Sequence, residues 1–139
     1  LMTSRTTKFK LFLERWADRP DGPTLFHARW ATHGTVSRAN CHPFQLKNHE
    51  LVVAHNGVIP GYGSRRKSDT RDYIEQVIEP LPGWFTEEGD LLEAMADSIA
   101  PSRMVLMDAT GRAVILNERL GTWRGGLWYS NDRAFSRPT

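Results

Sequence analysis

The chain has 139 residues, 40% of them hydrophobic, and a formal net charge of +2. This length and composition predict one domain over residues 1–139 with a hydrophobic core, and they exclude two independent domains. Lysine and arginine are spread along the chain, which argues against a nucleic-acid-binding face. No apolar run approaches the roughly 20 residues that cross a bilayer, so no membrane partner is expected.

Cysteine usage and the first residue set two further expectations. Cys41 is the only cysteine, so no internal disulfide can form, and we expect a cytoplasmic location. The first residue is Leu1 rather than methionine, which indicates that the sequence starts part-way into a longer reading frame.

One helix and three strands are predicted in the N-terminal part of the chain. Apolar side chains recur at helical spacing in a first segment, which predicts an amphipathic helix over residues 6–17. Strand-like segments follow at 24–31, 44–46 and 51–55. Polar residues 47–49 separate the last two segments, so these are expected to form an antiparallel hairpin.

Two helices and three further strands are predicted in the remainder. A basic, glycine-rich loop at 61–67 precedes a helix that is capped by Ser68 or Asp69 and ended by Pro80. A second helix is expected at 87–99, a hairpin at 104–107 and 113–116, and a last strand at 126–130. Consecutive hairpins and neighbouring helices predict an α+β fold with antiparallel sheet.

The polar residues are concentrated between Phe26 and Ile59. This stretch contains FHARWATHG, NCHPF and LVVAHNGVI, and with them all five histidines and the cysteine. Polar groups this dense among strand-like residues are typical of a functional site rather than of a core.

Four motifs in order, HARWATHG, NCHPF, AHNGVI and SDT, resemble those of the class II glutamine amidotransferases, which are N-terminal nucleophile hydrolases. The resemblance is strong from Phe26 to Asp69 and weak as far as the terminal WYSND. It implies an αββα sandwich with antiparallel sheets, hydrolysis of glutamine to glutamate and ammonia, and no cofactor. The ammonia acceptor, and any separate synthase partner that binds it, cannot be read from the sequence.

The resemblance implies a glutamine pocket made of Arg29, Trp30, Thr32, His33 and Asp69. A planar guanidinium suits the α-carboxylate of glutamine because it can form two parallel hydrogen bonds, and the aspartate would hold the α-ammonium. Each residue also has an ordinary alternative. The arginine could form a surface salt bridge, the tryptophan could belong to the core, and the aspartate could be a helix N-cap.

Asn56 and Gly57 match the family's oxyanion hole. Attack on the glutamine amide places negative charge on its oxygen, which the Asn56 side-chain amide and the Gly57 N–H could stabilise. The alternative is structural, because Asn-Gly after a strand is also a favoured hairpin turn.

The nucleophile departs from the family pattern. The family uses an N-terminal cysteine whose α-amine is the general base, whereas residue 1 here is leucine. Cys41 has no free α-amine, and its neighbour His42 would point to the opposite face of an extended chain, so Cys41 is interpreted as a small buried residue. Thr3 and Ser4 lead into a helix rather than a strand. We therefore expect the first strand and its cysteine to be missing, and the chain to be inactive as it stands.

Two other functions are weighed against this one. A metal-dependent hydrolase would use the histidines, but their spacing contains neither H-x-H nor H-E-x-x-H, so no metal site is predicted. A non-catalytic glutamine-binding or regulatory module, which keeps the pocket without the chemistry, remains open.

Overall fold

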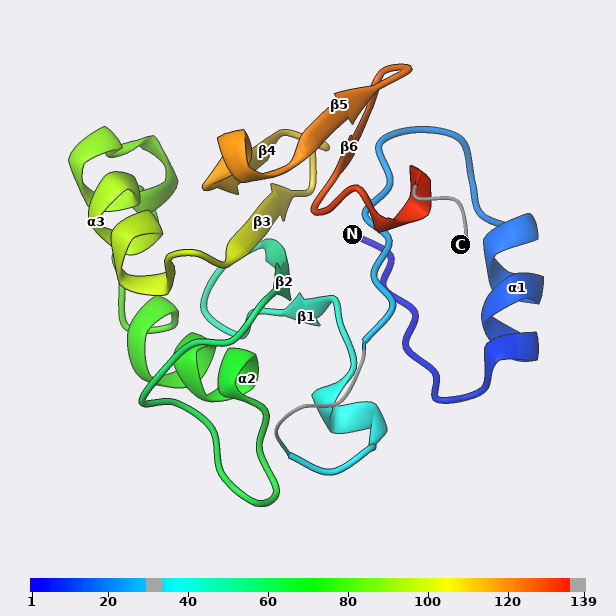
Figure 1. The fold of residues 1–139 in the computed structure, drawn as a ribbon, viewed down its shortest axis with the longest axis horizontal. Coiled ribbons are helices and arrows are strands. Elements are labelled where there is room, and N and C mark those ends of the chain that lie inside the picture. Colours follow the sequence, from blue (N-terminus) through cyan, green and yellow to red (C-terminus); the bar gives the residue numbers. More distant parts are fainter. Residues whose placement is uncertain (30–33, 136–139) are drawn as a thin grey trace.

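The computed structural model describes residues 1–29 and 34–135. Its helices and strands are arranged as a central set of strands with helices on either side (Figure 1). In chain order they are α1 (Phe9–Ala17), β1 (Phe44–Gln45), β2 (Leu51–Asn56), α2 (Asp69–Tyr73) with a π-helical continuation (Ile74–Ile78), α3 (Gly89–Ile99), β3 (Arg103–Asp108), β4 (Ala113–Leu116), β5 (Thr122–Arg124) and β6 (Leu127–Tyr129).

The main sheet has four antiparallel strands in the order β1-β2-β3-β4. Phe44 pairs with Val53 in the first hairpin, and Met104 pairs with Leu116 in the last, so both predicted hairpins are confirmed. The six residues of β2 pair with the six residues of β3. A separate two-stranded sheet, β5-β6, ends the described chain. The structure is thus a mixed α/β fold with antiparallel sheets, in agreement with the predicted class.

The hydrophobic core lies between one face of the main sheet and the helices α2 and α3. Side chains alternate between the two faces of a strand. Val53 and Leu106 therefore belong to the core, whereas Val52 and Met107 line a groove elsewhere. The helical side of the core is made of fully buried side chains, among them Tyr73, Ile78, Phe85 and Ile99.

The strand predicted over residues 24–31 is wrong for its described part. Residues 24–29 form no strand, and the end of the segment lies outside the described residues. The reason is that pairing with β1 ends at Val53, and beyond it a side chain already bonds the open edge of β2, since His42 Nδ1 accepts the His55 N–H. The segment instead contacts β2 through a side chain, because His27 Nε2 lies 2.8 Å from the His55 carbonyl oxygen.

The first helix is shorter and more exposed than the amphipathic pattern predicts. It begins at Phe9 rather than residue 6, and none of its residues is buried. Phe12 stacks on Phe26, with 4.9 Å between ring centroids, and Trp16 packs beside the same ring at 5.5 Å. The apolar face of α1 therefore packs in part against a local aromatic cluster and not against the core, and Phe9 and Leu13 stay exposed.

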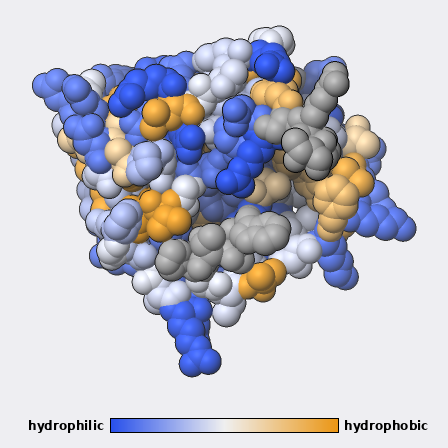
Figure 2. All heavy atoms as spheres, in the orientation of Figure 1, coloured by the Kyte–Doolittle hydropathy of each residue, from blue (hydrophilic) through white to orange (hydrophobic). Residues whose placement is uncertain are grey.

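Exposed hydrophobic side chains occur along the whole described chain, among them Phe9, Trp84 and Leu127. On the face drawn in Figure 2, hydrophobic side chains occur in separate patches between hydrophilic ones. Among the residues that the structure describes, no helix is both long and apolar enough to cross a bilayer.

Candidate functional site

The Asn56-Gly57 pair lies where the chain leaves the end of β2. Gly57 has φ +133° and is exposed, and a Cβ there would lie 2.2 Å from Ser102 Oγ, so only glycine fits. The hairpin-turn alternative is wrong. The strand that follows in the sheet is β3, which begins only at Arg103, so Asn56 and Gly57 begin a long connection instead of a two-residue turn.

Asp69 is tied to this strand end by a hydrogen bond. Its carboxylate is buried and accepts the Ile59 N–H at Oδ2 (2.7 Å) and the Thr70 N–H at Oδ1 (2.8 Å). Helix α2 is capped by Ser68, whose hydroxyl accepts the Arg71 N–H at 3.2 Å. The aspartate is therefore not the N-cap. Thr70 also donates its hydroxyl to Oδ1 at 3.5 Å. An ionised carboxylate has about four acceptor positions, so these three bonds leave capacity for a ligand cation.

Asn40 connects three of the sequence motifs, which the sequence reasoning did not predict. Its side chain is fully buried. Its amide group donates to the carbonyl oxygens of Thr35 (3.1 Å) and Arg66 (2.9 Å), and its carbonyl oxygen accepts the Ser68 N–H at 3.0 Å. One asparagine thus fixes the loop after HARWATHG against the residue that caps α2.

Three histidines form a buried cluster beside Asp69. The rings of His27 and His42 stack with centroids 3.9 Å apart. His42 Nδ1 accepts the backbone N–H of His55 at 3.1 Å, and His55 Nδ1 lies 2.8 Å from the Thr70 hydroxyl. The His42 side chain therefore supplies the hydrogen-bond acceptor for β2 just where the pairing with β1 stops at Phe44.

Burial keeps these histidines neutral. It lowers the pKa of His42 to about 2, with the neighbouring His27 acting in the same direction. It lowers the pKa of His55 to about 4, although the negative charge of Asp69 opposes the shift. The pKa of His27 is lowered by burial as well. A neutral His42 is what the geometry requires, because its Nδ1 acts as an acceptor.

Mild acid is therefore expected to destabilise the fold. The unfolded chain binds protons at these histidines near pH 6.5, while the folded chain does not, so stability is fully present above pH 6.5 and falls as the pH drops toward 4. The loss from His42 and His55 together is on the order of 3 kcal/mol between pH 7 and pH 5. Urea unfolding at pH 5, 6 and 7 measures it.

The variant His42→Asn tests the assignment of this pH dependence. Asparagine can still accept the His55 N–H but does not titrate. The slope of the free energy of unfolding against pH should therefore fall by about 1.4 kcal/mol per pH unit below pH 6. An unchanged slope in this variant would show that His42 does not contribute to acid stability.

Arg29 lines a groove that does not include the oxyanion pair. Its guanidinium donates to the Thr35 carbonyl at 3.4 Å. It lines a groove of about 890 Å³ between the N-terminal segment with α1 and the sheet, and the groove includes Cys41 and His42 but none of Asn56, Gly57 and Asp69. The described structure thus ties Asp69 to the strand end that carries Asn56 and Gly57, whereas the arginine lines this groove. The predicted pocket residues Trp30, Thr32 and His33 lie outside the described residues.

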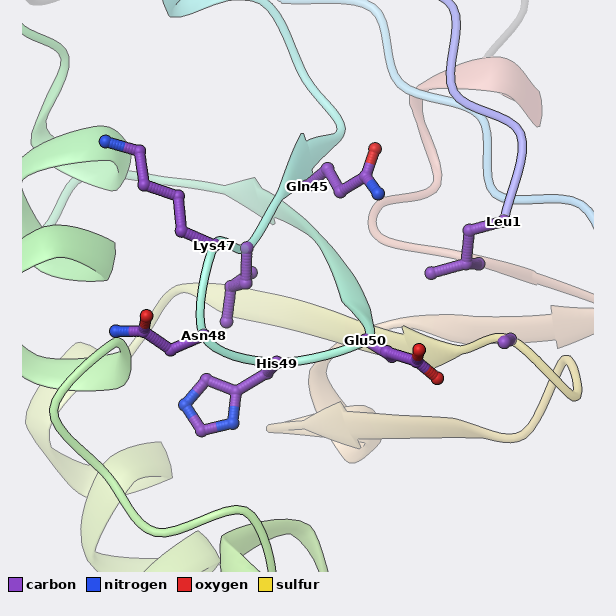
Figure 3. Close-up of a pocket in the computed structure, with 8 residues that line it drawn as sticks. Leu1, Gln45, Lys47, Asn48, His49 and Glu50 are labelled. Carbon is purple, nitrogen blue, oxygen red and sulfur yellow. The ribbon is translucent and has the colours of Figure 1, made fainter.

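A second hollow, of about 350 Å³, lies at the other end of β2 (Figure 3). It is formed by the β1-β2 turn, and its labelled side chains point in different directions rather than toward one centre. The turn is fixed by Glu79, whose carboxylate accepts the N–H groups of Lys47 and Asn48. This hollow is remote from Asn56, and we assign it no part in the site.

The described histidines contact protein groups, and one buried ring nitrogen each of His27, His49 and His55 has no hydrogen-bond partner among the described residues. Within residues 1–29 and 34–135, no group of three histidine, cysteine, aspartate or glutamate side chains could hold a metal ion. His27 and His55 make the contacts given above, and His49 packs edge-on against Phe85 at 5.2 Å. The site is thus built on a strand end, a buried carboxylate and neutral imidazoles.

Comparisons with known proteins give a family match for the sequence. The family model described as "Glutamine amidotransferases class-II" matches residues 10–81, just over half of the chain. No solved structure matches.

The similar curated proteins are isomerizing glutamine–fructose-6-phosphate aminotransferases. The one from Helicobacter pylori is 37% identical over 87 residues, which are 57% of this chain and 14% of that protein. The one from Escherichia coli is 34% identical over 113 residues, 73% of this chain and 18% of that protein. The one from Clostridium acetobutylicum is 38% identical over 84 residues, 53% of this chain and 13% of that protein. The matches span less than a fifth of each relative. The chain belongs to the class II glutamine amidotransferases.

Proposed function

We propose that this chain is the glutamine-hydrolysing part of an amidotransferase, and that Asn56 and Gly57 form its oxyanion hole. The observation that carries the proposal is the geometry at the end of β2. An exposed glycine follows Asn56, and the Ile59 N–H two residues later binds the buried carboxylate of Asp69. Donors for a developing oxyanion thus lie at the end of β2, and an acceptor for an ammonium group lies at the start of α2, joined to the β2 end by this hydrogen bond.

The proposed reaction divides the work among these residues. Attack on the side-chain amide of glutamine moves negative charge onto its oxygen, and the Asn56 amide and the Gly57 N–H stabilise that charge. Asp69 binds the α-ammonium. Arg29 binds the α-carboxylate, together with the pocket residues Trp30, Thr32 and His33. Because Arg29 lines another cavity in the structure, the proposal requires its loop to approach the strand end when glutamine binds.

The proposal assigns the nucleophile to a cysteine other than Cys41. The Cys41 thiol donates to the Ser37 carbonyl at 3.3 Å and lies 3.7 Å from the Thr6 carbonyl. Carbonyl oxygens do not remove a thiol proton, and a cysteine within the chain has no α-amine to serve as base. The thioester step of the family therefore needs a second cysteine, and residues 1–139 alone are proposed to be inactive.

Two finer features of fold and partner belong to the same proposal. We propose that residues 1–139 form a single domain of αββα type, in which α2 and α3 supply the helical layer on one sheet face. We also propose that the ammonia passes to an acceptor bound by a synthase domain or partner. The similar aminotransferases support this, since the matched part is a small fraction of their length.

Glutamine binding tests the proposed pocket. The variant Asp69→Asn removes the charge that pairs with the α-ammonium, and we expect the Kd for glutamine to rise about 10- to 100-fold. Isothermal titration of residues 1–139 measures binding, and a coupled assay should detect no glutamate from the same sample.

The matched control is Asp97→Asn on α3, which removes an exposed carboxylate and should leave the Kd unchanged. Equal affinities for both variants would remove Asp69 from the pocket. If the natural gene product bound glutamine without hydrolysing it, the alternative function would be favoured, a glutamine-binding module without catalysis. The observation that supports this alternative is the position of Cys41, whose thiol is bonded to a backbone carbonyl.

A further inference from the structure

Ser130 makes a direct contact with the proposed oxyanion hole from a distant part of the chain. It follows β6, and its hydroxyl oxygen accepts a hydrogen bond of 2.7 Å from Asn56 Nδ2. The two residues are 74 positions apart, and both are half-buried. Ser130 lies outside residues 10–81, which the family model matches.

The amide of Asn56 needs such a partner. Rotation about the last side-chain bond of asparagine has broad minima, so the rotamer alone does not fix the direction of its two N–H groups. A donor contributes to catalysis only when it is aimed at the oxyanion in advance. The bond to Ser130 occupies one N–H and sets the plane of the amide, which determines where the second N–H points.

The hairpin that carries Ser130 is itself anchored at this end of the sheet. Arg103 pairs with Asn56 across β2 and β3, and its guanidinium donates two hydrogen bonds of 3.3 Å to the Leu120 carbonyl just before β5. Thr122 then pairs with Tyr129, the residue before Ser130. Figure 1 shows β6 running from the tip of the hairpin toward the middle of the molecule. The hairpin that positions Ser130 is thus anchored by Arg103, which is the partner of Asn56 in the sheet.

We propose that Ser130 is a positioning residue for glutamine hydrolysis, and that the β5-β6 hairpin completes the oxyanion hole by orienting the Asn56 amide. This inference rests on the proposed function. It assigns to the C-terminal hairpin a role in the chemical step and none in glutamine recognition.

Steady-state glutaminase kinetics of the natural gene product test the proposal. Ser130→Ala should lower kcat about tenfold, as expected for loss of one hydrogen bond, and leave KM within about twofold. Ser130→Thr retains the hydroxyl and should restore most of kcat. In a background of Asn56→Ala, the change Ser130→Ala should have no further effect on kcat, because the amide that it orients is gone.

A matched control and a structural readout separate positioning from folding. Ser98→Ala removes a hydroxyl that contacts Tyr73 and the Met95 carbonyl on the helical layer, and it should not alter kcat. The side-chain ¹⁵N–H₂ signal of Asn56 should shift in Ser130→Ala and stay in place in Ser98→Ala. Unchanged kcat in Ser130→Ala, or a rise in KM alone, would overturn the positioning role while leaving the proposed function intact. A wild-type protein without glutaminase turnover would overturn both.

Discussion

Replacing Asn56 with alanine is expected to lower kcat for glutamine hydrolysis about 100- to 1,000-fold, with KM for glutamine little changed. The side-chain amide stabilises charge that exists only in the tetrahedral intermediate, so its removal raises the barrier without weakening ground-state binding. Glutamate release by the natural gene product, followed over a range of glutamine concentrations, gives both constants.

Asn48→Ala is the matched control at the opposite end of the same hairpin. Its side chain is exposed and donates to the Glu79 carbonyl at 3.2 Å, so this substitution should leave kcat unchanged. If Asn56→Ala instead raised KM and left kcat as it was, the asparagine would be a binding residue, and the oxyanion assignment would be wrong.

Substitution of Gly57 by alanine is expected to abolish measurable turnover and to destabilise the fold by about 2–5 kcal/mol. Two costs combine. A backbone at φ +133° is adopted almost only by glycine, and forcing another residue into it costs about 1–3 kcal/mol. The added Cβ would also lie 2.2 Å from Ser102 Oγ, an overlap that displaces a buried side chain. The unfolding midpoint in urea measures stability.

Gly61→Ala separates the two costs, because Gly61 has φ +84° but no atom within 4 Å of an added Cβ. This variant should be destabilised only by the backbone strain, and it should retain glutaminase turnover. Combining Gly57→Ala with Ser102→Gly should recover part of the stability by removing the overlap. Equal stability of the Gly57 and Gly61 variants would show that Ser102 yields to the methyl group at no cost.

The regular elements could be predicted where local pattern and tertiary pairing agree. β2 has a continuous apolar run, and a polar turn precedes it. This pattern predicts the hairpin in which Phe44 pairs with Val53. The segment 24–29 has the same local character but forms no strand, because the side chains of His27 and His42 already bond the backbone of His55 where the pairing with β1 has ended. Strand β5 was not predicted. Its three residues, Thr122 to Arg124, are too few to show alternation, and it pairs only with β6.

Of the candidate site, only the residues inside the four sequence motifs could be predicted. Asn56, Gly57 and Asp69 were proposed because they lie in short recognisable segments, and the structure ties Asp69 to Ile59, three residues after Asn56. The choice between Ser68 and Asp69 as helix cap needed coordinates, since both residues can cap. Asn40 and Ser130 could not be predicted, because their roles depend on partners 26 to 74 residues away in the chain.

The contact between His42 and the His55 backbone constrains how this family member can diverge. A ring nitrogen takes the place of a strand carbonyl, so the sheet is extended by one hydrogen bond without extending β1. A descendant that loses His42 must supply another acceptor or leave a buried N–H unpaired immediately before Asn56. Substitutions at position 42 should therefore occur together with substitutions in the neighbouring loop. The histidine of NCHPF would then persist in evolution even where it takes no part in the reaction.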